Sequence, residues 1–207
     1  MVSQVSQVSQ TDRISLVVFL GNYGKEYEKT RHNAAWLFAA SLDFFPRLSW
    51  QRKFRGQWAS LPWRSGQEER QVYFLMPETY MNLSGESAAG LASFYKIPPQ
   101  EILAVHDEIE LDFGTVSLKR GGGLGGHNGL RSLKSCLGTP DFWRIRLGVG
   151  KPPHPDVASY VLSPFSRKEE KDLPFVFQAA EEILCSVLTR APSSVPEEWR
   201  KKKTLEP

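Results

Sequence analysis

The sequence predicts one α/β domain, built on a twisted, mostly parallel mixed β-sheet that is flanked by helices. Short apolar runs that end at glycine or proline alternate with longer segments of helical apolar spacing, a pattern typical of a parallel sheet. The first run, Ile14–Leu20, is apolar on both faces and ends at Gly21, as expected of a strand buried on both sides. The length of 207 residues and a hydrophobic content of 41% suit a single soluble domain with a substantial core.

The elements that follow are predicted in order from the same signals. Residues His32–Phe45 have the apolar spacing of a helix and stop at Pro46. The stretch Leu48–Arg70 is aromatic and basic and is interrupted by glycine and proline, which predicts short strands or a hairpin at a sheet edge. Residues Val72–Leu75 form a further apolar strand that Pro77 ends.

The second half of the chain continues the alternation of strands and helices. The segment Ser84–Tyr95 has a helical apolar face, and the strand Ile102–Val105 delivers His106, Asp107 and Glu108 at its end. The remaining predicted elements are the strands Thr115–Leu118 and Arg144–Val149 and the helices Leu130–Leu137 and Lys168–Leu188. Ligands of such sheets bind beyond the carboxyl ends of the strands, so Asn22, Asp107 and the glycine loop after Lys119, which all follow strand ends, are expected to share one crevice.

The domain is expected to span residues 14–191, between two tails. The N-terminal residues 1–13 carry a threefold Val-Ser-Gln repeat without the pattern of a secretory signal, which predicts a disordered tail. Residues 192–207 carry four successive cations, Arg200 to Lys203, and are expected to form a basic tail. No apolar stretch approaches the ~20 residues that span a bilayer, and two cysteines suit a reducing compartment. We therefore expect a cytoplasmic protein that does not associate with membranes.

The segment Lys119–Gly129 contains five glycines in six positions, flanked by cations before and by His127 and Asn128 after. Such a loop is kept where bare backbone approaches a ligand, and here the charge indicates a phosphate-bearing one. Because the net charge is only +3, any nucleic-acid affinity must come from a local patch. The loop lacks the Gly-Lys-Ser/Thr of a P-loop and the acid of a dinucleotide site, and a flexible linker is the alternative.

Polar residues in four loops supply the chemistry of a hydrolytic site. A histidine such as His32 paired with Asp107 makes a general base, and neutral asparagines such as Asn22 and Asn82 can hold a carbonyl or a water. No Gly-x-Ser-x-Gly elbow is present, which favours direct attack by water over a covalent intermediate. Each residue also has a structural interpretation: a helix cap for His32 and Asn82, and a turn for Asn22.

Four motifs in a fixed order give the chain a resemblance to a known family. They are Gly-Asn-x-Gly-x-x-Tyr-x-x-Thr-Arg-His-Asn (residues 21–33), Thr-Tyr-Met-Asn-Leu-Ser-Gly (79–85), His-Asp-Glu (106–108) and Lys-x-Gly-Gly-Gly-x-Gly-Gly-His-Asn-Gly-Leu-Arg-Ser (119–132). In these motifs the chain resembles the bacterial-type peptidyl-tRNA hydrolases, from about Ile14 to Leu188. The resemblance implies an enzyme that cleaves the ester between a peptide and the 3′ ribose of tRNA, without a cofactor or metal.

The resemblance also implies roles for individual residues. His32 matches the base that activates water, Asp107 the acid that orients it, and Asn22 a group that stabilises the oxyanion. The residues expected around the substrate are Asn82 and Asn128, which match amides that hold the peptide and the 3′ adenosine end, Met81 and Tyr27, which match wall positions, and His127, a supporting neighbour.

The tRNA body is expected to bind through its phosphates. Lys119 matches a phosphate-binding lysine and Arg146 a basic position on the next strand, while Arg120 and Arg131 are added for their charge and proximity. An open tRNA-binding face favours a monomer.

Three positions depart from the family pattern. Tyr23 stands where the family has proline, Met76 where lysine is usual, and Ser117 where a basic residue can occur.

Three other functions are alternatives to peptidyl-tRNA hydrolysis. They are those of a non-catalytic RNA-binding relative of the same fold, a nucleotide-binding α/β enzyme, and a metal hydrolase, for which the histidines lack a suitable spacing.

Overall fold

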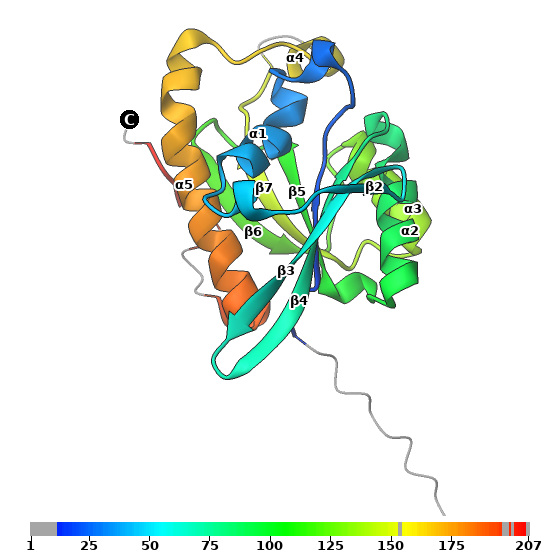
Figure 1. The fold of residues 1–207 in the computed structure, drawn as a ribbon. Helices are drawn as coiled ribbons and strands as arrows, with labels where there is room; N and C mark the ends of the chain where they lie inside the picture. Colours follow the sequence, from blue (N-terminus) through cyan, green and yellow to red (C-terminus); the bar gives the residue numbers. More distant parts are fainter. Residues whose placement is uncertain (1–11, 153–154, 196–198, 200, 206–207) are drawn as a thin grey trace, which may run out of the picture.

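The computed structural model describes residues 12–152, 155–195, 199 and 201–205. Within these residues the chain forms one eight-stranded sheet in the order β2-β3-β4-β1-β5-β7-β6-β8, with helices on both faces, which confirms the α/β prediction (Figure 1). The strands are β1 (Leu16–Phe19), β2 (Gln51–Lys53), β3 (Gly56–Ser65), β4 (Glu68–Pro77), β5 (Ile102–Glu108), β6 (Thr115–Arg120), β7 (Trp143–Gly148) and β8 (Lys202–Lys203). The central strands β4, β1, β5 and β7 are parallel, and the strands on either side of them pair antiparallel.

Helices cover both faces of this sheet. Figure 1 shows α1 and α5 on one face, α2 and α3 on the other, and α4 beyond the ends of the strands. The α-helices are α1 (Ala34–Ser41), α2 (Ser84–Tyr95), α3 (Asn128–Leu137), α4 (Val157–Val161) and α5 (Arg167–Thr189). Short 3-10 helices occur at η1 (Lys25–Tyr27), η2 (Arg31–Asn33), η3 (Phe45–Arg47), η4 (Met81–Leu83), η5 (Pro99–Glu101) and η6 (Pro192–Ser194). No helix among the residues described is long and apolar enough to cross a bilayer.

The core consists of two apolar layers, one on each side of the sheet. In β1, Val17 and Phe19 face the layer beneath α1 and α5, whereas Leu16 and Val18 face the layer beneath α2 and α3. All four side chains are buried, because successive residues of a strand point to opposite faces and both faces are covered. The apolar run in the sequence therefore reports a strand at the centre of the sheet.

Two predicted elements have different bounds in the structure. The helix predicted to start at His32 begins as the 3-10 turn η2 and becomes the α-helix α1 only at Ala34, ending at Ser41. The strand predicted at Val72–Leu75 is the end of the ten-residue β4, which pairs with β3 along its whole length. The proline at position 62 does not divide this hairpin.

The C-terminal segment packs against the domain. Val195 and Pro192 are buried, and Lys203 and Lys202 of β8 pair with Thr115 and Val116 of β6. The predicted N-terminal tail lies outside the described residues up to position 11. Its last two residues bond to the domain: Asp12 accepts a hydrogen bond from the Ser193 amide at 3.3 Å, and the Arg13 guanidinium lies 3.1 Å from Glu101.

Candidate active site

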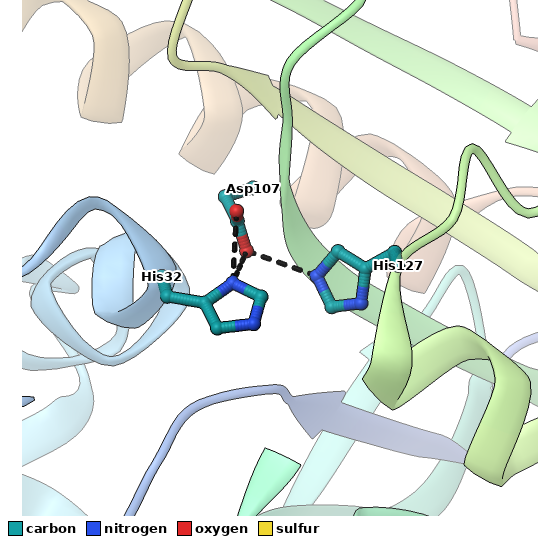
Figure 2. Close-up of side chains that lie close together, drawn as sticks. All are labelled: His32, Asp107 and His127. Atoms are coloured by element: carbon teal, nitrogen blue, oxygen red, sulfur yellow. Dashed lines mark hydrogen bonds and ion pairs between the residues drawn. The ribbon is translucent and has the colours of Figure 1, made fainter. Parts of the chain in front are cut away.

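Three side chains from separate elements meet beyond the central strands of the sheet: His32 from η2, Asp107 from the end of β5, and His127 from the residue that caps α3. Figure 2 shows the carboxylate of Asp107 between the two imidazoles. Its Oδ1 lies 2.9 Å from Nδ1 of His32 and 2.9 Å from Nε2 of His127, and its Oδ2 lies 3.0 Å from Nδ1 of His32. All three residues are mostly buried. Because both rings bond to Asp107, one carboxylate orients both histidines.

The hydrogen bonds fix a different tautomer for each ring. Nδ1 of His127 faces the backbone N–H groups of Gly129 and Leu130 at 3.1 and 3.4 Å, so it must be the acceptor nitrogen. Its Nε2–H therefore donates to Asp107. In His32 the nitrogen that donates to Asp107 is Nδ1, which leaves Nε2 with its lone pair directed away from the carboxylate (Figure 2). This Nε2 has the orientation of a general base.

The electrostatics of the group favour an ionised carboxylate. Burial would raise the pKa of Asp107, but the neighbouring His32 and His127 and their hydrogen bonds hold it well below its usual value. For His32, burial lowers the pKa, yet the charge of Asp107 and the hydrogen bond to it outweigh burial, so the pKa is raised. Asp107 thus stabilises the imidazolium form of His32.

A third imidazole, His106, is buried beside this group. Burial, reinforced by the nearby His127, holds the pKa of His106 well below its usual value, so this ring is neutral. Its Nδ1–H donates to the backbone carbonyl of Asp107 at 2.7 Å, and its ring meets that of His127 edge-on with centroids 5.0 Å apart. His106 therefore packs behind the site.

The turn that carries His32 is anchored by its neighbour Arg31. One guanidinium nitrogen of Arg31 donates to Oγ of Ser163 at 2.9 Å, and another lies 2.8 Å from Glu169. Glu169 also accepts from the amide of Ser166 in the capping box of α5. The start of α5 therefore fixes the position of the turn η2.

Asn22 is held by its backbone and by its side chain. Oδ1 of Asn22 accepts the backbone N–H of Met81 at 2.8 Å. The side chain of Asn33 bonds to both backbone groups of Asn22, accepting from N–H and donating to C=O at 2.9 Å each. With Oδ1 fixed as acceptor, the Nδ2 group of Asn22 is the side available to donate. Asn33 lies in the first motif, but no pattern in the sequence marked this function.

A cavity of about 330 Å³ opens beside the His–Asp–His group. Of the predicted substrate residues, Asn128 and His127 line it, whereas Met81 and Asn82 do not. The predicted catalytic residues His32 and Asp107 line it, and Asn22 is not part of its wall. Apolar residues form another part of the wall, namely Ile109 and the α4 residues Val157, Ala158 and Val161. Of the residues outside the wall, Met81 is buried in the core and Asn82 is exposed, while Tyr27, near His32 in the chain, is half-buried.

The glycine loop between β6 and α3 has the backbone that only glycine adopts easily. Gly121, Gly122, Gly125 and Gly126 all have positive φ, between 56° and 84°. The buried guanidinium of Arg144 donates to the carbonyls of Gly122 and Gly123 at 3.1 and 2.7 Å and fixes the loop. Gly125 and Gly126 line the cavity, so the loop supplies part of its wall and presents His127 and Asn128.

A second hollow of about 430 Å³ contains the predicted phosphate-binding cations Lys119, Arg120 and Arg146. Nε of Arg146 lies 3.0 Å from Glu108, which lines the cavity of the histidines, so this ion pair stands between the two hollows. Arg120 is engaged by Asp141 through two bonds of 2.8 and 2.9 Å.

The remaining predicted cation lies outside this hollow. Arg131 is exposed and donates to Oδ1 of Asn128. The predicted tRNA contacts are thus unequal, because Arg120, Arg131 and Arg146 already have partners whereas Lys119 forms no ion pair with a described carboxylate.

The residues His32, Asp107 and His127 also offer three potential metal ligands within 4.8 Å of one another. One nitrogen of each ring donates to Asp107, and the other nitrogen of His127 accepts from the backbone. The three side chains therefore satisfy one another by hydrogen bonds, and their arrangement requires no ion.

Comparison with known proteins gives consistent matches over nearly the whole chain. The sequence model of a family described as peptidyl-tRNA hydrolase matches residues 16–206. A peptidyl-tRNA hydrolase of Treponema pallidum is 48% identical over 199 residues, covering 93% of this chain and 97% of that protein. One from Rhodococcus jostii is 45% identical over 175 residues, covering 84% and 91%.

Solved structures match as well. A crystal structure of a peptidyl-tRNA hydrolase in complex with N-propanol superposes with a TM-score of 0.77 at 36% identity, covering 87% of this chain and 91% of that one. The peptidyl-tRNA hydrolase of Acinetobacter baumannii gives a TM-score of 0.74 at 36% identity, covering 90% and 92%.

Proposed function

Since the chain belongs to the peptidyl-tRNA hydrolase family, we propose that its His32–Asp107 pair activates the water that cleaves the substrate ester. The chain is an enzyme that hydrolyses the bond between the peptide and the tRNA 3′ ribose, and so returns tRNA from prematurely released peptidyl-tRNA to translation. The orientation of His32 is the observation that supports the proposed residue roles most: Nδ1 is bound to Asp107, and Nε2 remains as the base.

The proposed reaction is a general-base hydrolysis. Nε2 of His32 takes a proton from water as the hydroxide oxygen bonds to the ester carbonyl carbon, and Asp107 stabilises the imidazolium. The Nδ2 group of Asn22 donates to the carbonyl oxygen as it becomes negative. When the tetrahedral intermediate collapses, the C–O bond to the ribose breaks and the 3′ oxygen takes the proton from His32. The products are a peptide acid and free tRNA.

The substrate is proposed to lie across both hollows. We propose that Asn128 and His127, in the wall of the cavity, contact the peptide and the 3′ end, and that Asn82, Met81 and Tyr27 contribute from positions outside that wall. Lys119 and Arg146 are proposed to bind tRNA phosphates. We assign Arg120, Arg131 and Arg146 weaker contributions than Lys119, because Asp141, Asn128 and Glu108 already bind them. We further propose a cytoplasmic monomer, in keeping with two free cysteines.

The test is release of N-acetyl amino acid from N-acetyl-aminoacyl-tRNA, with a chelator present, by the wild type and His32→Ala. We expect kcat of the variant to fall by about two to four orders of magnitude while tRNA binding is retained. Near-wild-type activity of His32→Ala would remove this residue from the role of base. Binding of tRNA without hydrolysis by the wild type would instead favour the non-catalytic RNA-binding alternative.

A further inference from the structure

The C-terminal segment that packs against β6 forms part of the hollow that holds the phosphate-binding cations. Pro192, Ser193 and Val195 line the same hollow as Lys119 and Arg146. The chain then continues to β8, which pairs with the outer edge of β6. The far end of the sequence is therefore a structural component of this surface.

We propose that this docked segment is part of the tRNA-binding surface, with Lys201 and Lys203 contacting phosphates of the tRNA body beside Lys119 and Arg146. The inference rests on the proposed function, because it names a further contact for the same substrate. The ligand of this surface is a phosphate backbone, because the surface offers several cations spaced along neighbouring β-strands.

The register of the strands places these cations on one face of the sheet. Lys203 pairs with Thr115, and Arg146 pairs with Ser117, so the side chains of each pair share a face. Thr115, Ser117 and Lys119 alternate along β6 and lie on that same face. Lys203 and Lys119 are four residues apart in register, about 13 Å along the strand. That distance covers several successive phosphates of one RNA strand.

The middle lysine of the segment anchors it from the opposite face. Nζ of Lys202 lies 2.9 Å from Glu182 of α5 and 4.7 Å from the centre of the Trp199 ring. Lys201 and Lys203 are exposed, and neither forms an ion pair with a described carboxylate. One lysine therefore fixes the segment, and its two neighbours carry charge that no carboxylate of the described residues pairs with.

The experiment compares the double variant Lys201→Gln/Lys203→Gln with wild type in binding deacylated tRNA, measured by fluorescence anisotropy over a series of salt concentrations. We expect the slope of log K against log salt to decrease by about one per lysine, and Kd at 0.1 M salt to rise at least about fivefold. Charge reversal, Lys201→Glu/Lys203→Glu, should give a larger rise.

The matched control is Arg52→Gln/Arg64→Gln, which removes the same charge from β2 and β3 on the other half of the sheet, where the side chains are 71% and 78% exposed. We expect wild-type binding from this control. Equal salt slopes for the two double variants would overturn the inference, provided that thermal midpoints show both to be folded.

A kinetic comparison separates this inference from the proposed function. The ratio of kcat/KM for N-acetyl-aminoacyl-tRNA to that for an N-acetyl-aminoacyl ester of a short CCA oligonucleotide should fall in the lysine variant. If wild type hydrolyses both esters and the ratio is unchanged, the inference fails while the function stands. If wild type hydrolyses neither ester, and the lysine variant still binds tRNA more weakly than wild type, the function fails and the binding surface stands.

Discussion

Asp107 orients the whole site, because one of its oxygens accepts from two imidazoles at 2.9 Å each. Asparagine at this position keeps the shape but replaces one acceptor oxygen with an N–H₂ group, which cannot accept from either ring. It also removes the charge that stabilises the imidazolium of His32. The orientation of the His32 ring and its basicity therefore both depend on the carboxylate of Asp107.

We predict that Asp107→Asn lowers kcat by about two to four orders of magnitude with little change in tRNA affinity. Single-turnover hydrolysis of N-acetyl-aminoacyl-tRNA measures the first quantity and anisotropy the second. A loss of affinity equal to the loss of kcat/KM would assign Asp107 to substrate binding and not to the base.

The rate of hydrolysis should depend on pH through the ionisation of His32. The pKa of His32 is raised from 6.5, and only the neutral ring can take a proton. Log kcat/KM should therefore fall as pH decreases through an inflection above 6.5, and in Asp107→Asn the inflection should move to lower pH. An acid limb that inflects below 6.5 in the wild type contradicts this assignment.

The same ionisation affects stability with the opposite sign. A raised pKa means that the pair of His32 with Asp107 stabilises the fold fully below 6.5 and loses this contribution as pH rises through the folded pKa. The pH range in which the base is active is thus the range in which this contribution is lost.

At the scale of elements, the position of His127 depends on how closely α3 approaches α2. A Cβ atom on Gly85 would lie 2.1 Å from the carbonyl oxygen of Ser132, so α2 contacts the backbone of α3 directly at this glycine. The Gly85 amide also donates to Oγ of Ser132 at 2.9 Å. Since His127 caps α3, any separation of the two helices moves the imidazole away from Asp107.

We predict that Gly85→Ala lowers the free energy of unfolding by about 1–3 kcal/mol or more and also lowers kcat. The matched control is Gly90→Ala on the same helix, where a Cβ would meet only Phe54 at 3.8 Å. That variant should be neutral or slightly stabilising, because alanine is the better helix former. Urea unfolding of the two variants distinguishes backbone contact from helix propensity.

The elements that local patterns predict well are those whose signal comes from their own residues. The helix at Ser84–Tyr95 has the predicted bounds, and the apolar run near β1 indicated a strand buried on both faces. Asp107 and the glycine loop line one cavity as expected, although Asn22 is not part of its wall. The rule for parallel sheets does not explain this meeting, because β6 runs antiparallel to β7 and ends beside Trp143 at the start of that strand. The pairing of β8 could not be predicted, because two lysines carry no apolar periodicity.

The details of the site follow from contacts between distant segments. That Nδ1 of His127 accepts from the backbone, and that Asn33 clamps Asn22, depends on packing that no spacing in the chain encodes. The role of Arg144 is similar: its sequence position indicates a strand residue, whereas its guanidinium holds the glycine loop. Sequence patterns identified the chemical groups, and tertiary structure determines which atom of each group is available.

At the scale of the molecule, charge is concentrated locally although the net charge is only +3. Lys119 and Arg146 share one hollow, and the ion pair of Arg146 with Glu108 separates it from the cavity of the histidines. The residues proposed for phosphate binding and those proposed for ester cleavage thus lie in adjoining but distinct hollows.

We predict that Lys119→Ala weakens binding about evenly across different tRNAs and lowers the salt slope by about one. Measuring Kd for several deacylated tRNAs at a series of salt concentrations checks both. A loss confined to one tRNA would indicate that Lys119 reads a base, not a phosphate.

The opposite tautomers of His32 and His127 should be distinguishable by NMR. His32 carries its proton on Nδ1 and His127 on Nε2, so the nitrogen resonances of the two rings should differ in a ¹⁵N NMR spectrum. Both protons are held by Asp107 in a buried setting and should exchange slowly with solvent. A substrate analogue that contacts Nε2 of His32 should shift the signals of that ring first. The enzyme therefore carries its own reporter of occupancy at the base, readable without a label on the RNA.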